Sequence, residues 1–231
     1  PTQHRGALLR HVFFEGFENG ATGWSHGAIS GVDEWEIGAP QGRSGTAWQD
    51  PSAAASGSNC AGTDLGLVGD GVYQPGSLTW LRSPSIDCTG ISGVRLRFRR
   101  QLTCPGPLDY GEIRINGTLV WRSPFTSALD AAWTTFELLV PAAANNPSVV
   151  VEFRMVSGGS VAYGGWNIDD FEFYSLDFAV PLAASMTLLP EQAQVGAPIA
   201  LTIGTGAPQL FLMLLGDAPG PLVIPGVATL Q

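Results

Sequence analysis

Residues 94–99, VRLRFR, alternate apolar and basic side chains without a break. Successive side chains of a β-strand point to opposite faces of a sheet, so this segment has one apolar face and one basic face. That pattern is typical of an antiparallel strand that covers a core on one side and meets water on the other. The stretch therefore predicts a half-buried strand.

Similar short runs follow one another along the chain, each bounded by Gly, Pro, Asn or Asp. They are residues 112–116, 134–140, 149–154 and 171–174. Asn116-Gly117 separates two apolar runs and is the dipeptide that tight hairpin turns favour. No helical period is longer than two turns, and residues 128–133 form at most a short turn. The sequence predicts an all-β fold of two packed sheets.

All eleven basic residues of the 231-residue chain are arginines, because lysine is absent. Enzymes that need a lysine amine, for a Schiff base or a phosphate loop, are therefore excluded. Three of the arginines share the basic face of residues 94–99 and could bind an anion. Acidic residues on the other predicted strands, namely Glu112, Glu137 and Glu152, favour a ladder of cross-strand ion pairs instead.

The composition indicates an acidic chain that folds. Its net charge of −9 disfavours nucleic acids and anionic membranes as partners, because both bind clustered basic residues. Only 13% of the residues are charged and 45% are hydrophobic, which is the opposite of a disordered chain. No stretch approaches the roughly 18 apolar residues of a membrane-spanning helix.

The composition changes near residue 177. Residues 178–231 contain seven prolines and only two charged residues, Glu191 and Asp217, and their apolar runs predict three or four strands. A core built from so short a segment is marginal by itself. We therefore divide the chain into an N-terminal arm at 1–12, a β-sandwich at 13–177 and a small apolar β domain at 178–231. A strand from another subunit could complete the last of these.

Five ordered segments resemble a known group of modules. They are FENGATGW at 17–24, DEWEIG at 33–38, SGSNC and GTDL at 56–65, WLRSPSID at 80–87 and GWNIDDFE at 165–172. They look like the jelly-roll modules of bacterial secreted and surface proteins: MAM-type domains, cleaved-adhesin domains of gingipain-like proteins, and the module of immune-inhibitor-type metalloproteases. The resemblance covers about residues 13–175. It implies a jelly-roll β-sandwich in an extracellular, accessory protein.

The same resemblance implies a structural calcium ion between the first and last strands. The matching residues are Glu18, Asp64, Asp169 and Asp170. Ca²⁺ binds about six to eight oxygens, and carboxylates brought together from distant segments repel one another without a cation. The alternative is that these acids are solvated strand ends or turn residues.

The three cysteines cannot all pair within one chain. An extracellular protein is expected to form one disulfide and leave one thiol over. Cys60 and Cys88 lie in the segments that resemble the modules, so we expect these two to pair and Cys104 to stay free or buried. Three reduced thiols are the alternative.

No catalytic motif is present. The three histidines lie in the first 26 residues and outside any nucleophile context, and no metalloprotease or phosphate-loop motif occurs, so we predict that the chain is not an enzyme. Trp35 and Trp48 are the tryptophans expected to be exposed and able to stack on a sugar, whereas the other five are expected to fill the sandwich. Asn116 fits a glycosylation sequon, although its place in a hairpin turn already explains it.

Two classes of function remain. In the first, the chain is an extracellular structural or adhesive protein that assembles with copies of itself, with the arm donated as a strand to a neighbour and a filament as the outcome. In the second, it is an accessory module that binds a carbohydrate or a surface protein.

Overall fold

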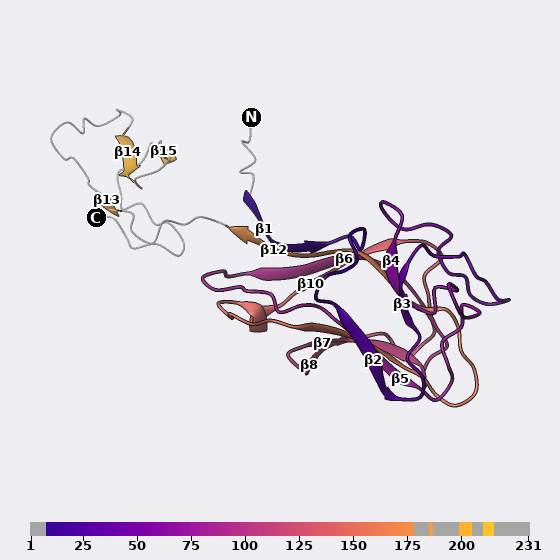
Figure 1. Cartoon of the computed structure of the whole chain (residues 1–231). Coiled ribbons are helices and arrows are strands. Elements are labelled where there is room, and N and C mark those ends of the chain that lie inside the picture. The colour runs from indigo at the N-terminus through magenta and orange to yellow at the C-terminus, as the bar shows by residue number, and fades with distance from the viewer. Residues whose placement is uncertain (1–7, 178–184, 187–198, 205–209, 215–231) are drawn as a thin grey trace. The chain divides into compact units, whose positions relative to one another are not determined.

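The computed structural model describes residues 8–177 and, beyond them, the strands at 185–186, 199–204 and 210–214. The chain divides into two units, Pro1–Phe178 and Ala179–Gln231. The first is an all-β sandwich of two antiparallel sheets with the jelly-roll architecture that the sequence predicts (Figure 1).

One sheet has the strand order β10-β6-β12-β4-β3, with β1 and β9 attached to β12 and β6. Its strands are β1 (Leu8–Glu15), β3 (Trp35–Gly38), β4 (Cys60–Thr63), β6 (Val94–Cys104), β9 (Ala128–Leu129), β10 (Thr134–Leu139) and β12 (Gly165–Asp177). We call it the seven-stranded sheet.

The second sheet has the order β2-β5-β11-β7-β8, and we call it the five-stranded sheet. Its strands are β2 (Ser25–Ser30), β5 (Leu78–Arg82), β7 (Tyr110–Ile115), β8 (Thr118–Arg122) and β11 (Val151–Val156). A short 3-10 helix, Pro141–Ala143, follows β10. Figure 1 shows the two sheets stacked face to face, and the core lies between them.

The alternation at residues 94–99 is confirmed, because Val94, Leu96 and Phe98 are fully buried in β6 while the arginines between them are half-buried. The centre of the core is Trp166 in β12, which is also fully buried. Its ring centroid lies 5.7 Å from that of Phe153 and 6.2 Å from that of Phe98. Aromatic rings from both sheets therefore meet at one point of the sandwich.

The hairpin at Asn116-Gly117 is confirmed as well. Both residues have positive φ, 48° and 81°, which is the requirement of a type I′ turn. The Asn116 side chain also donates to Ser148 O and accepts from Val150 N–H, so it ties the turn to the start of β11. The sequence signal and the structural role of Asn116 agree.

Residues 8–12 of the expected N-terminal arm belong to the sandwich. They open β1, which pairs antiparallel with β12 of the same chain, from Leu8 opposite Asp177 to Glu15 opposite Phe171. This pairing uses the β12 edge and buries Phe13 against Phe171, at 5.9 Å between ring centroids. The arm thus folds back on its own domain over these residues, while residues 1–7 lie outside the described residues.

The described part of the second unit is an antiparallel sheet of order β13-β14-β15, with bounds Ser185–Met186, Ile199–Gly204 and Leu210–Leu214. β14 and β15 lie at two of the apolar runs from which strands were predicted, whereas β13 does not, and the apolar run at residues 222–224 lies outside the described residues. Within the described residues, no helix is long and apolar enough to cross a membrane.

Candidate functional site

Three of the four predicted calcium ligands converge on one loop, residues 55–59. Glu18 Oε1 accepts two hydrogen bonds from backbone N–H groups of this loop, at 2.7 and 2.8 Å. Asp169 Oδ2 accepts two more, at 2.8 and 3.1 Å, and the Ser56 hydroxyl donates to Asp170 Oδ1 at 2.6 Å. The segment that follows β1 and the strand β12 are therefore both joined to this loop by carboxylates.

Asp64 lies apart from those three residues. Its carboxylate accepts hydrogen bonds from the N–H groups of Gly66 and Asp70, at 3.0 and 3.1 Å, and it closes its own turn with a φ of 51°. Within residues 8–177, no group of three or more His, Cys, Asp or Glu side chains is arranged to hold a metal ion. The structure therefore does not gather Glu18, Asp64, Asp169 and Asp170 into one cluster.

Asp50 is a buried carboxylate that the sequence does not reveal. It is 6% exposed, and its Oδ1 accepts a hydrogen bond from Asn167 Nδ2 at 3.1 Å. Its Oδ2 has no partner among the described residues. Burial raises the pKa of Asp50 to about 7, and the nearby charge of Asp64 contributes to the shift. This carboxyl group therefore changes its charge near neutral pH.

The predicted disulfide between Cys60 and Cys88 is not present. All three cysteines are buried free thiols. Cys60 lies in β4 opposite Gly38, whereas the Cys88 N–H donates to Asn146 O in a different part of the sandwich. Burial raises the pKa of each thiol, and for Cys104 to about 11. The thiols act as small apolar core groups.

The expectation that Trp35 is exposed is wrong, because its side chain is 3% exposed and belongs to the core. Residue 35 is the first of β3, and its side chain points inward from the seven-stranded sheet. Trp48 is half-buried in the turn between Ser44 and Gln49. It packs on Gly45, where a Cβ atom would lie 2.4 Å from the indole nitrogen. Its role in binding stays a prediction.

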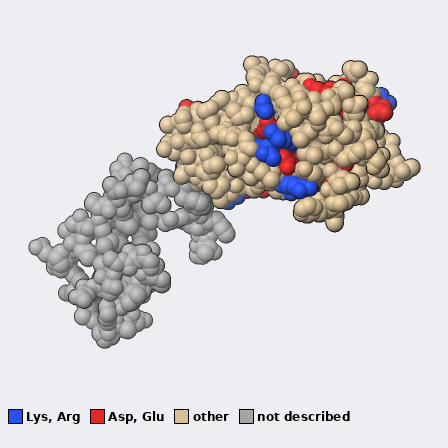
Figure 2. Space-filling view, turned by 90° about the horizontal axis from the view of Figure 1, so that it is seen from below, with Lys and Arg blue, Asp and Glu red and all other residues tan. Residues whose placement is uncertain are grey.

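Charged side chains cross the outer face of the five-stranded sheet in two rows. The first row runs over Arg82, Glu152 and Arg114, which lie opposite one another on β5, β11 and β7. The second row runs over Trp80, Arg154, Glu112 and Arg122, on β5, β11, β7 and β8. Figure 2, which views this side of the molecule, shows a stripe of blue and red side chains crossing a face that is mostly uncharged.

The two glutamates of these rows lie beneath the arginines. Glu152 accepts hydrogen bonds from Arg82 Nε and Arg154 Nε, and Glu112 accepts one from Arg114 Nε at 2.9 Å. The Glu152 side chain is 6% exposed, whereas that of Arg82 is 42% exposed. Because the carboxylates are covered more deeply than the arginines that they bind, this face presents positive charge to a ligand.

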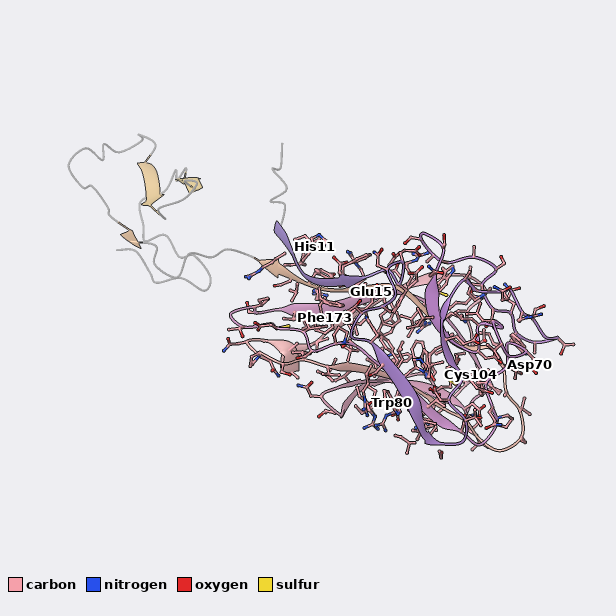
Figure 3. All side chains as sticks on the ribbon, viewed as in Figure 1. His11, Glu15, Asp70, Trp80, Cys104 and Phe173 are labelled. Atoms are coloured by element: carbon pink, nitrogen blue, oxygen red, sulfur yellow. The ribbon has the colours of Figure 1, made fainter. Side chains whose placement is uncertain are left out.

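Aromatic rings hold the arginines at both ends of the face. At one end, the Arg82 guanidinium lies 4.1 Å from the Trp80 ring, and Trp80 lies flat over Gly27, where a Cβ atom would approach its ring to 2.6 Å. Figure 3 shows Trp80 at the lower, outer side of the sandwich. At the other end, Arg122 lies 3.5 Å from the Tyr110 ring and 4.6 Å from that of Phe125. Stacking on a ring fixes a guanidinium while its N–H edge stays available.

Phe125 is the most exposed ring of this face, at 71%. A large apolar side chain that is exposed to solvent beside arginines of fixed orientation is typical of a contact residue in a binding surface. We call the set Trp80, Arg82, Tyr110, Arg114, Arg122, Phe125 and Arg154 the arginine face.

The outer face of the seven-stranded sheet is different. Here Arg95 pairs with Glu137 at 2.7 Å, so the ion-pair ladder is confirmed for these two residues. Glu112 and Glu152 do not join it, because they lie on the other sheet. Arg97 pairs with Glu172, while Arg99 donates to Thr135 Oγ1 at 2.8 Å and to a backbone oxygen.

A hollow of about 310 Å³ lies on this second face. Its lining mixes both charges with apolar groups: Phe14, Arg97, Phe98, Arg99, Thr135, Asp170 and Glu172. Because acids and bases alternate around it, the hollow favours neither anions nor cations.

Sequence reasoning placed Trp80 in the core, and this was wrong. In β5, Thr79 and Leu81 are buried, at 3% and 0% exposed, and point inward. Trp80 and Arg82 therefore point outward, as the period of two along a strand requires. The alternation in residues 78–82 was the signal that could have found this residue.

The chain is similar in structure to several solved proteins, but the comparisons do not assign it to a family. No protein-family model matches the chain. The carbohydrate-binding module TmCBM61, solved with β-1,4-galactotriose, is 13% identical, with a TM-score of 0.46 over 69% of this chain and 94% of that one. The K1 cleaved adhesin domain of Lys-gingipain from Porphyromonas gingivalis is 16% identical, with a TM-score of 0.45 over 73% and 98%.

A Stig cyclase from Fischerella sp. TAU is similar to a comparable degree, with 11% identity and a TM-score of 0.43 over 72% of this chain and 98% of that one. Cleaved-adhesin domains, one of the groups that the sequence resembles, are thus among the similar structures. Similarity at this level concerns the fold and does not assign a function.

Proposed function

We propose that this protein is an extracellular, non-catalytic binding module and that the arginine face is where it binds a carbohydrate. The observation that carries the proposal is the arrangement of rings and guanidinium groups on one sheet. Trp80, Tyr110 and Phe125 offer aromatic surface, and the four arginines offer fixed hydrogen-bond donors between them. Binding sites combine apolar and aromatic area with a few oriented polar groups in this way.

Rigidity supports the proposal. Arg82, Arg114 and Arg154 are held by buried glutamates, and Arg122 is held by the rings of Tyr110 and Phe125, so few rotamers are open to the four arginines before a ligand arrives. A surface that is already ordered loses less conformational entropy on binding. The hydroxyl groups of a sugar can accept hydrogen bonds from these donors.

Replacing Phe125 by alanine is expected to weaken glycan binding by about 5- to 30-fold, because contact aromatic residues contribute about 1–2 kcal/mol or more. The side chain is 71% exposed, so the melting temperature should hardly change. The measurement is isothermal calorimetry of the full chain with the glycans that it retains on a polysaccharide array.

Phe14→Ala is the matched control for this test, because Phe14 is 58% exposed on the other sheet. Its affinity should equal that of the unchanged protein. A chain that binds no glycan on the array, or one that loses affinity only with the Phe14 variant, would contradict the proposed function.

Self-association through a donated strand remains the alternative function. The part of the arm at residues 8–12 is paired with β12 of its own chain, so it is not free to be donated in this structure. A structural or filament-forming role then depends on the second unit, whose apolar strands β14 and β15 pair with each other. We favour the binding role, because it has a defined surface.

We also propose that Ca²⁺ supports the sandwich at residues 55–59, with Glu18, Asp169 and Asp170 as its ligands and without Asp64. The loop at residues 55–59 donates N–H and hydroxyl hydrogen bonds to all three carboxylates. Because the three are not arranged as one metal-binding group in this structure, Ca²⁺ would replace some of these hydrogen bonds. A divalent cation would offset their mutual repulsion and tie the first strands to the last.

Removing calcium with a chelator is expected to lower the melting temperature by about 5 to 10 °C, because a bound ion stabilises only the folded chain. Added Ca²⁺ should restore the original value in a thermal shift assay. Glu18→Gln should abolish the response, and Asp64→Asn should retain it. An unchanged melting temperature in chelator and in added Ca²⁺ would rule out this site.

A further inference from the structure

Arg122 differs from the other arginines of the arginine face in having no carboxylate partner. Arg82 and Arg154 bind Glu152, and Arg114 binds Glu112. Arg122 lies opposite Glu112 across β7 and β8, yet that carboxylate bonds to Arg114. Among the residues that the structure describes, Arg122 donates no side-chain hydrogen bond, and its buried Nε has no acceptor.

A guanidinium group has five N–H donors and no acceptor, so its hydrogen bonds must all come from acceptors on other groups. Burying part of such a group without an acceptor costs free energy. The stacking on Tyr110 and Phe125 holds the group in place but supplies no hydrogen-bond acceptor. Arg122 is only half-buried, so its other N–H groups are available to an acceptor on a ligand.

The charge of the face points to the same kind of ligand. Its four arginines against two glutamates leave a local charge of +2 on a chain whose net charge is −9. Since the rest of the molecule repels polyanions, an anionic ligand would be directed to this face. Planar carboxylates match the two-pronged donor geometry of arginine, and the arginines lie along rows that a chain-like ligand could follow.

We propose that the ligand of the arginine face is an acidic polysaccharide and that one of its carboxylate groups binds Arg122 between Tyr110 and Phe125. This inference rests on the proposed function, and it names the chemical class of the ligand that the module binds. The remaining arginines would bind further carboxylates or hydroxyl groups along the same chain. Phe125 would cover the apolar side of the sugar unit at Arg122.

The test compares polygalacturonate with its methyl ester, which keeps the sugar backbone and removes the charge. We expect the full chain to bind the acid, and to bind the ester about 10- to 100-fold more weakly, because hydrogen bonds to charged groups are worth about 1.5–3 kcal/mol. Arg122→Gln should weaken binding of the acid to a similar extent and leave the affinity for the ester nearly unchanged.

The matched control is Arg99→Gln, because Arg99 also lacks a carboxylate partner in the described chain but lies on the other sheet. It should bind polygalacturonate like the unchanged protein. Arg122→Lys, which keeps the charge and loses the planar donor geometry, should give an intermediate loss. Circular dichroism and the melting temperature show whether each variant is folded, and a folded Arg122→Gln chain with full affinity would overturn the inference.

Dextran sulfate separates carboxylate recognition from general attraction to polyanions. Equal losses of polygalacturonate and dextran sulfate binding with Arg122→Gln and Arg99→Gln would mean general attraction and would overturn the inference. Equal affinity for the acid and the ester, lost with Phe125→Ala, would also overturn it while the proposed function stands. Binding to no polysaccharide at all would remove the proposed function itself.

Discussion

Replacing Trp166 by alanine is expected to lower the free energy of unfolding by about 3–5 kcal/mol, the cost typical of truncating a large buried aromatic side chain. The ring is fully buried and contacts the rings of Phe98, Trp121 and Phe153. It also fills the space over Gly111, and its Nε1 donates to Arg154 O at 2.9 Å. The variant would thus leave a cavity at the centre of the sandwich and lose the hydrogen bond to Arg154 O.

Chemical denaturation followed by circular dichroism measures this loss. Trp48→Ala is the control, because Trp48 is half-buried in a turn, and it should cost far less. Trp166→Phe should fall between the two, since it keeps part of the ring volume and loses the hydrogen bond. Equal losses for Trp166→Ala and Trp48→Ala would contradict the assignment of Trp166 as the centre of the core.

Replacing Asp50 by asparagine is expected to stabilise the protein at pH 8, by up to about 4 kcal/mol, and to have little effect at pH 4. Burial raises the pKa of Asp50 to about 7 in the folded chain. The folded chain then binds a proton more tightly than the unfolded chain does. The stability of the folded chain falls as the pH rises from about 4 to 7, because ionising a buried carboxyl group that has only one hydrogen-bond donor beside it is unfavourable.

Thermal unfolding between pH 4 and 8 checks this prediction. Asp87→Asn is the matched control with the opposite sign, because the Thr89 hydroxyl and N–H lower the pKa of the exposed Asp87. A carboxyl group with a lowered pKa stabilises the folded chain above its unfolded pKa and loses that contribution in acid. If Asp50→Asn were instead destabilising at pH 8, the carboxylate would have a partner that the structure does not reveal.

Local patterns were enough to predict the strands of the sandwich. The alternation of residues 94–99 and the Asn116-Gly117 turn report directly on which side chains are buried and where the chain reverses. Such signals depend only on residues that are close in the sequence. They therefore predict a strand or a turn even when the positions of the other strands are not known. The strands at 112–116, 134–140 and 171–174 were found for the same reason.

The candidate site could not be predicted in this way, because it depends on which strands become neighbours. Glu112 and Glu152 were assigned to the arginines of β6, yet their partners are on β5, β7 and β11. Trp35 has an acidic residue on each side in the sequence and was expected to be exposed. Its side chain lies on the face of β3 that points into the core, so it is buried. Strand order and register, which the sequence alone does not give, decide both cases.

The central claim is that the outer face of the five-stranded sheet binds the ligand. The most direct measurement is the change in backbone amide NMR shifts when oligogalacturonate is added to the full chain. The account predicts that the shifts concentrate on β5, β7, β8 and β11, around Trp80, Arg114 and Arg122. Shifts confined to β1, β6 and β10, or none at saturating ligand, would contradict it.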